Sequence, residues 1–265
     1  MHGIATKAPP RGLLSPVSGP DDVADRGRSR FAVATSRARC WRARSRVSGA
    51  AMKGDVVLVE AHHRRASAII AERLATDVRN RTRRTTISVA GESGSGKSEL
   101  GQALVEAFDT LGIPGAVLGQ DDYFILPPRS NDRARRRDIS AVGPQEVHLD
   151  QLDGHLAAAR SGASEIRKPL VIYADDAIEE ETLRLGNARV VVVEGTYTTL
   201  LQNVDTRVFI GRNRLETMEA RARRARESAD PFIEEVLKIE HAIISAHRSR
   251  ADVILSKDYE VEFVR

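Results

Sequence analysis

The stretch that most restricts the fold of this chain is residues 91–98, which read Gly-Glu-Ser-Gly-Ser-Gly-Lys-Ser and fit the pattern G-x-x-x-x-G-K-[ST] without a mismatch. A β-prone run, residues 85–90, precedes it, and a helix-forming run, residues 99–108, follows it. Glycines allow backbone N–H groups to turn inward around phosphate oxygens, and the start of a helix adds further N–H groups and the positive end of its dipole. A flexible Gly/Ser loop is the alternative, but the flanking strand and helix favour a loop that binds the phosphates of a nucleotide.

Two side chains of this loop have separate expected roles. Lys97 would reach the β- and γ-phosphates, and the Ser98 hydroxyl would hold Mg²⁺. The pattern therefore predicts ATP and Mg²⁺ as cofactors. The residues expected to contact the nucleotide are Gly91, Glu92, Ser93, Gly94, Ser95, Gly96, Lys97, Ser98 and Glu99.

The first 51 residues differ in composition from the rest of the chain. They hold ten of the 41 Lys and Arg residues but three of the 37 Asp and Glu residues, which leaves 31 basic and 34 acidic side chains in residues 52–265. The formal charge of +4 therefore comes from this leader, and nucleic acid is not expected as a partner of the folded domain. The leader is rich in Pro, Gly, Ser and Arg and is predicted to be disordered, ahead of one folded domain at residues 52–265 that carries the phosphate loop.

Three origins of the leader remain open: an organellar transit peptide, a nucleic-acid-binding tail, or an over-extended reading frame whose true start is Met52. The abrupt change of composition at Met52 favours the third. Asp21 and Asp22 weigh against a transit peptide, which is poor in acidic residues.

Cysteine count and hydropathy exclude several classes of protein. Cys40 is the single cysteine, so a disulfide framework and a multi-cysteine zinc site are excluded. No apolar run approaches the ~20 residues that a membrane-spanning helix needs. A cytoplasmic protein without a membrane partner is expected.

The alternation of apolar runs with helical patterns predicts an α/β fold, a doubly wound parallel sheet of five strands. The expected strands are residues 85–90, 116–118, 190–193, 206–210 and 252–255. Helices are expected at 55–78, 144–156 and 232–246, with a short strand at 56–59 as the alternative at the start. His62 and His63 are expected to be solvated rather than to bind a metal.

Carboxylates follow two of the expected strands. Asp121 and Asp122 come after the strand at 116–118, and Glu194 ends the strand at 190–193. In an open parallel sheet, ligands bind beyond the carboxyl ends of the strands, so these acids are expected near the phosphate loop. Ser98, Glu194 and Asp121 are the candidate metal ligands. Capping of a turn or helix remains the alternative role for Asp121 and Asp122.

Three further segments are expected around this site. Residues 125–143 are predicted to be a mobile segment that carries a cluster of arginines. The cluster either forms a solvated face or binds an anionic substrate. Residues 168–173 and the acidic run at 179–181 can form a hairpin on the substrate side. Residues 214–226 are predicted to form an arginine-rich helical lid, with a solvated helix of internal ion pairs as the alternative.

Several motifs occur together in one order. The chain lacks the Leu-Ser-Gly-Gly-Gln signature of transporter ATPases and the Asn-Lys-x-Asp motif of GTPases. The phosphate loop, Gln-Asp-Asp-Tyr-Phe at 120–124, Glu-Gly-Thr at 194–196 and the arginines of 214–226 follow the order of the uridine kinase and phosphoribulokinase family. Over residues 85–260 the chain resembles that family, which implies a P-loop fold with a substrate hairpin and a lid, and transfer of the ATP γ-phosphoryl group to a hydroxyl.

The resemblance also implies roles for individual residues. Asp121 matches the family's aspartate that takes the proton of the substrate hydroxyl; with Lys97 and the neighbouring Asp122 it makes up the catalytic candidates. Glu194 matches the acid on the metal side. The lid residues expected to contact ATP are Arg221, Arg224 and Arg226, and the candidates for acceptor contacts are Tyr123, Tyr173, Arg129 and Arg137.

One departure from the family bears on the substrate. Uridine kinases carry an Asp-His-Pro stretch whose aspartate holds the ribose hydroxyls, whereas this chain reads Val142-Gly143-Pro144. The prediction is an ATP- and Mg²⁺-dependent kinase of a small metabolite with a hydroxyl acceptor. A nucleoside leads over a phosphoribulokinase-like sugar phosphate, and a non-catalytic protein switched by ATP is the second class. A homo-oligomer is compatible with the sequence.

Overall fold

The computed structural model describes residues 57–217 and 230–265. The leader at 1–51 lies outside the described residues, as do Arg221, Arg224 and Arg226 of the expected lid. The leader, the domain boundary at Met52 and the lid therefore stay predictions.

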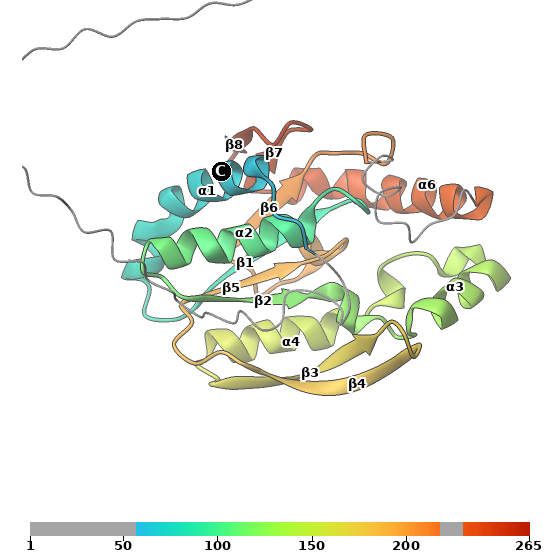
Figure 1. Cartoon of the computed structure of the whole chain (residues 1–265), viewed down its shortest axis with the longest axis horizontal. Helices are drawn as coiled ribbons and strands as arrows, with labels where there is room; N and C mark the ends of the chain where they lie inside the picture. The colour runs from blue at the N-terminus through green and yellow to red at the C-terminus, as the bar shows by residue number, and fades with distance from the viewer. Residues whose placement is uncertain (1–56, 218–229) are drawn as a thin grey trace, which may run out of the picture. The chain divides into compact units, whose positions relative to one another are not determined.

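A six-stranded sheet forms the centre of the described chain (Figure 1). The strands are β1 (Thr85–Gly91), β2 (Gly115–Gly119), β5 (Val190–Glu194), β6 (Thr206–Ile210), β7 (Val253–Leu255) and β8 (Val261–Phe263), in the order β2-β5-β1-β6-β7-β8. The first five are parallel, with Thr85 opposite Val190 in the pairing of β1 with β5. This confirms the predicted parallel sheet. The sixth strand, β8, pairs antiparallel with β7 and was not predicted.

Helices cover both faces of the sheet. Helices α1 (Ala61–Asn80) and α2 (Lys97–Thr110) lie on one face, and α4 (Leu149–Arg160) lies on the other (Figure 1). Strand β5 packs against helices on both of its faces, because successive side chains of a strand point to opposite sides of the sheet. Val190 and Val192 pack in the cluster with α1 and α2. Val191 and Val193 pack in the cluster with α4. All four valines are fully buried, and each contributes about 1.5–3 kcal/mol by leaving water. Burial on both faces explains why the strand reads as an unbroken apolar run.

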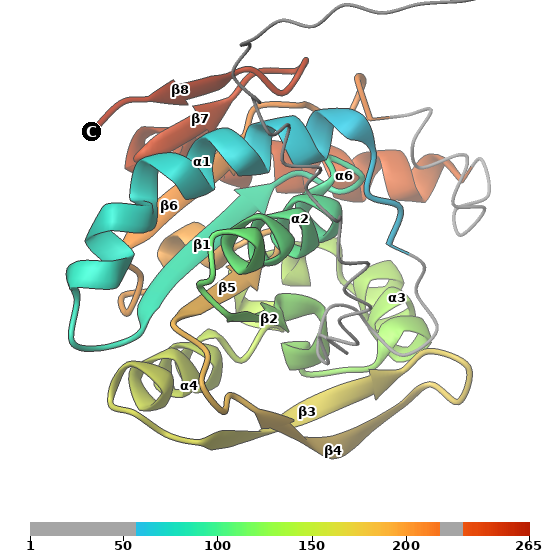
Figure 2. The ribbon, with the colours of Figure 1, turned by 60° about the vertical axis from the view of Figure 1, so that its left-hand side comes forward.

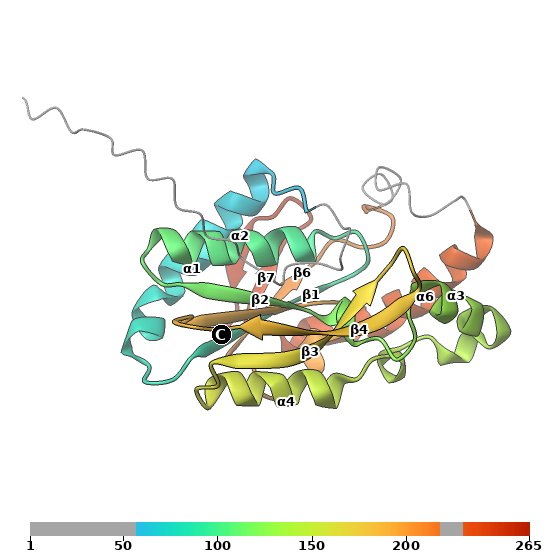
Figure 3. The same cartoon turned by 60° about the horizontal axis from the view of Figure 1, so that its bottom comes forward.

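The predicted hairpin is present as β3 (Glu165–Ile172) and β4 (Ala177–Arg184), two antiparallel strands beside α4 (Figure 3). The last long helix, α6 (Pro231–Ser245), also forms as predicted. Its first turn is capped by the Asp230 carboxylate, which accepts a hydrogen bond from the backbone N–H of Phe232 at 2.9 Å.

Other local expectations were wrong. Instead of a mobile segment, residues 128–137 form helix α3 (Pro128–Arg137), which begins with proline at the first helical position, where its missing N–H does no harm. Helix α1 begins at Ala61, and residues 57–60 form neither helix nor strand. The segment after Gly143 starts with a single 3-10 turn, and α4 begins only at Leu149.

None of the described helices is both long enough and apolar enough to cross a lipid bilayer.

Candidate active site

The phosphate loop joins the carboxyl end of β1 to the amino end of α2. Gly94 and Gly96 have φ angles of 72° and 93°, the left-handed region that glycine adopts without strain. At Gly96 a Cβ would collide with the Tyr259 hydroxyl and would lie 2.8 Å from His63 Nε2, so only glycine fits there. Gly96 caps α2, whose first backbone N–H groups are available to an anion.

A buried contact from the C-terminal segment braces this loop. The Tyr259 hydroxyl donates a hydrogen bond to the Ser95 carbonyl, and His63 Nε2 lies 3.1 Å from the same hydroxyl. Tyr259 is 2% exposed and has a φ angle of 64°, which a tyrosine rarely adopts. The expectation that both histidines are solvated was therefore wrong for His63, which is buried because it supports the loop.

Ser98 and Glu194, two of the expected metal ligands, are hydrogen-bonded to each other. Ser98 Oγ donates a hydrogen bond to Glu194 Oε2 at 3.2 Å, and Lys97 Nζ donates to the Glu92 carbonyl at 2.9 Å. Burial and, to a smaller extent, the nearby Asp121 carboxylate raise the pKa of Glu194 to about 8, against an opposing effect of Lys97.

This donor set fits a nucleotide-bound magnesium ion. A buried carboxylate with a second carboxylate nearby is costly unless a cation neutralises it, and Mg²⁺ prefers oxygen ligands such as Ser98 and Glu194. Within residues 57–217 and 230–265, no group of three or more His, Cys, Asp or Glu side chains is arranged to hold a metal. Mg²⁺ is commonly held by one or two protein ligands together with phosphate oxygens of a nucleotide, and Ser98 and Glu194 suit that arrangement.

The short 3-10 helix after β2, Gln120–Tyr123, sends its side chains in different directions. Asp121 is exposed at the carboxyl edge of the sheet. The Asp122 carboxylate is buried and binds Lys168 Nζ at 2.6 Å and the Val171 N–H at 3.0 Å. Tyr123 is fully buried, with its hydroxyl 2.8 Å from His155 Nδ1. This corrects the expectation that Tyr123 contacts the acceptor, since its hydroxyl is enclosed in the core beside α4.

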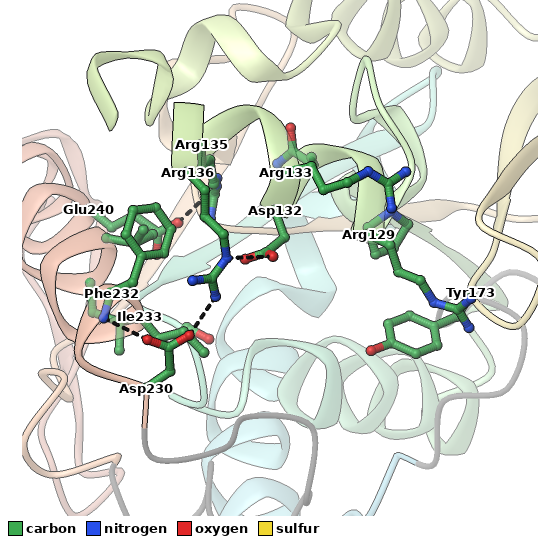
Figure 4. A pocket seen from close by; sticks show the side chains of 15 residues that line it. Arg129, Asp132, Arg133, Arg135, Arg136, Tyr173, Asp230, Phe232, Ile233 and Glu240 are labelled. Carbon is green, nitrogen blue, oxygen red and sulfur yellow. Dashed lines mark hydrogen bonds and ion pairs between the residues drawn. The ribbon is translucent and has the colours of Figure 1, made fainter. Parts of the chain in front are cut away.

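Next to the phosphate loop lies a cavity of about 520 Å³ (Figure 4). Its walls come from Ser93 of the loop, from α3, from Tyr173 at the tip of the hairpin and from α6. The lining residues are Ser93, Pro128, Arg129, Asn131, Asp132, Arg133, Arg135, Arg136, Tyr173, Asp230, Phe232, Ile233, Val236, Leu237 and Glu240. Its size is typical of small-molecule sites. Arg129 and Tyr173, two of the predicted acceptor residues, thus lie on one cavity, whereas Arg137 is exposed on α3 and does not line it.

Residues 86–212, which hold the phosphate loop, Asp121 and Glu194, match the model of the phosphoribulokinase / uridine kinase family. Over these residues the chain is similar to that family.

Over 196 residues, the chain is 32% identical to the bifunctional alpha-galactosidase/sucrose kinase AgaSK of Mediterraneibacter gnavus. The matched region covers 69% of this chain but 21% of that protein. The chain thus spans about a fifth of the length of this curated relative.

Two solved structures share the fold. One is described as a possible uridine kinase from Bacillus stearothermophilus, with a TM-score of 0.50, 18% identity and coverage of 72% of this chain and 97% of that one. The other is D-glycerate 3-kinase from Cryptococcus neoformans, with a TM-score of 0.52, 15% identity and coverage of 77% and 99%.

Most arginines that line the cavity are ion-paired. Arg135 contacts Glu146 at 2.6 Å and Glu240 at 3.2 Å, and Arg136 contacts Asp132 at 2.9 Å and also Asp230. In addition, Arg133 pairs with Asp176 at 3.2 Å, while the Arg129 guanidinium donates to the Ala174 carbonyl. The cavity therefore offers many hydrogen-bonding groups with little surplus charge.

Several residues that shape the candidate site were not predicted from the sequence. Lys168 is fully buried and links Asp122 to Glu181, each at 2.6 Å. The register of the hairpin, which sets Lys168 opposite Glu181, would have indicated this contact. The His241 contact to Glu92, at 2.6 Å, joins α6 to the phosphate loop and has no local signal in the sequence.

Proposed function

We propose that this chain is an ATP- and Mg²⁺-dependent kinase that phosphorylates a hydroxyl group of a small carbohydrate. The observation that carries the proposal is the meeting of Ser98, Glu194 and Asp121 at the carboxyl edge of the sheet, beside a cavity that begins at Ser93. A phosphoryl group held by the loop would face an acceptor in that cavity.

Each residue has a role in this proposal. Lys97 and the N–H groups of the loop bind the β- and γ-phosphates, while Ser98 and Glu194 hold Mg²⁺. Asp121 orients the acceptor hydroxyl and accepts its proton as the new O–P bond forms and the bond to the β-phosphate oxygen breaks. The Mg²⁺ ion, when bound with ATP, neutralises charge on the phosphates.

Two observations support a carbohydrate over a nucleoside. The cavity is lined by paired charges, Asn131 and Tyr173, which suit a neutral molecule with many hydroxyls. Glu146 is the first carboxylate after Gly143 in the sequence. Its oxygens accept hydrogen bonds from Arg135, Asn131 and the Gly143 N–H. It therefore does not replace the ribose-binding aspartate of uridine kinases. The sucrose kinase named among the relatives is consistent with this choice.

The test is ADP release from Mg²⁺ATP with a panel of mono- and disaccharides, sugar phosphates and nucleosides. One carbohydrate should stimulate turnover. Lys97→Ala and Asp121→Asn should each lower kcat about 10²–10⁴-fold, because Lys97 binds the transferred phosphoryl and Asp121 accepts the proton of the acceptor hydroxyl. Asp109→Asn, at an exposed position on α2, is the matched control and should leave kcat unchanged.

Other outcomes would redirect the proposal. Stimulation by uridine or cytidine instead of a sugar would restore the nucleoside as acceptor. ATP hydrolysis that no acceptor stimulates would favour a non-catalytic protein switched by ATP.

A further inference from the structure

A second polar cavity lies at the end of the sheet opposite the phosphate loop. It measures about 470 Å³ and lies where the α1–β1 loop, the end of α4 and the segment before β5 come together, on the left in Figure 2. Four arginines line it, Arg83, Arg84, Arg160 and Arg189, together with the hydroxyl-bearing Thr82 and Ser161. No carboxylate is among its lining residues.

The arginines around this cavity outnumber their acidic partners. Asp205 is contacted by Arg81 at 2.8 Å, by Arg83 at 2.7 Å and by Arg160 at 3.5 Å. The other two guanidinium groups bind only backbone carbonyl oxygens: Arg84 binds four at 2.7–3.0 Å, and Arg189 binds two. Among the contacts of these five guanidinium groups in the described part of the chain, Asp205 is therefore the single carboxylate, which leaves a surplus of four positive charges.

Several donors of this cluster have no hydrogen-bond partner among the residues that the structure describes. A guanidinium group carries five N–H bonds. Both hydrogen bonds of Arg189 come from Nη2, and the contact of Arg160 with Asp205 is a long one. Burial, and then repulsion by Arg189, lowers the pKa of Arg84, as expected where cations are crowded without enough counter-charge.

We propose that this cavity binds a small phosphate-bearing metabolite, at a site separate from the phosphate loop. Guanidinium groups bind phosphate through pairs of parallel hydrogen bonds, and Ser161 and Thr82 add neutral hydrogen-bonding groups. The concave shape and the volume suit a small molecule, whereas nucleic acid needs an extended basic surface. Strand β1 begins at Thr85, directly after Arg84, and ends in the phosphate loop, so one element links the two sites.

The test is a calorimetric titration of the full-length protein with sodium phosphate at constant ionic strength. Saturating Mg²⁺ADP fills the phosphate loop first, so the signal comes from elsewhere. Arg160→Gln removes a lining guanidinium that makes one long ion pair, and Arg167→Gln removes an arginine that is 73% exposed on β3 as the matched control. Thermal unfolding checks that both variants are folded.

The expected result is saturable binding of one phosphate, weakened at least tenfold by Arg160→Gln and unchanged by Arg167→Gln. Equal affinities of the two variants, or no saturable binding with ADP present, would overturn the proposal. A single-stranded oligonucleotide that binds the wild type far more tightly than phosphate, and loses affinity in Arg160→Gln, would also overturn it in favour of a polyanion surface. All of these outcomes are binding measurements and do not depend on the proposed kinase reaction.

Discussion

Neighbouring residues of this chain have different chemistry because the backbone directs them differently. Asp121 and Asp122 are adjacent in sequence, yet Asp121 is exposed at the edge of the sheet and Asp122 is buried between the 3-10 helix and the hairpin. The buried carboxylate is bound by Lys168, which also reaches Glu181. We therefore assign Asp122 to anchoring the hairpin and keep Asp121 for the reaction.

The prediction at this scale concerns Lys168. Lys168→Met should lower the free energy of unfolding by about 3–5 kcal/mol, because it leaves the Asp122 carboxylate buried without its cation. Urea denaturation measures the change, and Lys238→Met, an exposed lysine on α6, should change it by less than about 0.5 kcal/mol.

Asp122→Asn separates anchoring from catalysis. It should also lower stability, yet kcat measured on folded enzyme should stay within about tenfold of the wild type, unlike kcat of Asp121→Asn. A loss of kcat as large as that of Asp121→Asn, without loss of stability, would make Asp122 a catalytic residue.

At the scale of elements, the phosphate loop is held by segments that lie outside the family match. His63 comes from α1 and Tyr259 from the turn between β7 and β8. The two side chains are hydrogen-bonded to each other, and the Tyr259 hydroxyl donates to the Ser95 carbonyl. A loop whose N–H groups must point at phosphate gains from such a brace, because less conformational freedom is lost on binding.

We expect Tyr259→Phe to weaken Mg²⁺ADP binding about 5–10-fold, since one hydrogen bond to the loop, worth about 1–1.5 kcal/mol, is lost while the ring remains. Calorimetry measures the dissociation constant. Tyr123→Phe is the matched control, because it removes the hydroxyl of another buried tyrosine, one that binds His155 rather than the loop. The brace has no role in binding if the two variants bind Mg²⁺ADP equally.

At the scale of the whole molecule, the acceptor cavity is assembled from distant parts of the sequence. Arg135 of α3 binds Glu146 and also Glu240 of α6, a residue more than one hundred positions away. Burial raises the pKa of Glu240, and Arg135 opposes that shift, so the ion pair keeps the charges of the cavity balanced.

Arg135→Met should therefore raise KM for the acceptor at least tenfold and leave KM for ATP within about twofold, because it breaks the buried ion pair between α3 and α6 without touching the phosphate loop. Steady-state kinetics measures both constants, with the carbohydrate that stimulates ADP release in the panel as the acceptor. Arg137→Met is the control on the same helix, since Arg137 is exposed and does not line the cavity. Parallel increases in both constants would indicate general damage to the fold instead.

Much of the fold and part of the site could be predicted from local patterns. The phosphate loop was predictable because its glycines and Lys97 act through nearby backbone, and β5 because burial on both faces needs an unbroken apolar run. Strand β8 was not predictable, because its three residues, Val261, Glu262 and Phe263, gain their stability from pairing with β7. Helix α3 was missed because its arginine-rich sequence lacks an apolar stripe, and its partners lie on α6 and the hairpin.

The sequence by itself determined the α/β class, the phosphate loop and the acids at the strand ends, because these depend on residue type, spacing and the direction of parallel strands. Only the tertiary structure decided which acid is buried, which tyrosine braces the loop and which arginines share a cavity. Those properties arise from contacts between segments far apart in the chain, such as Lys168 with Asp122 and Tyr259 with Ser95. Packing, unlike periodicity, leaves no signal within a short stretch of sequence.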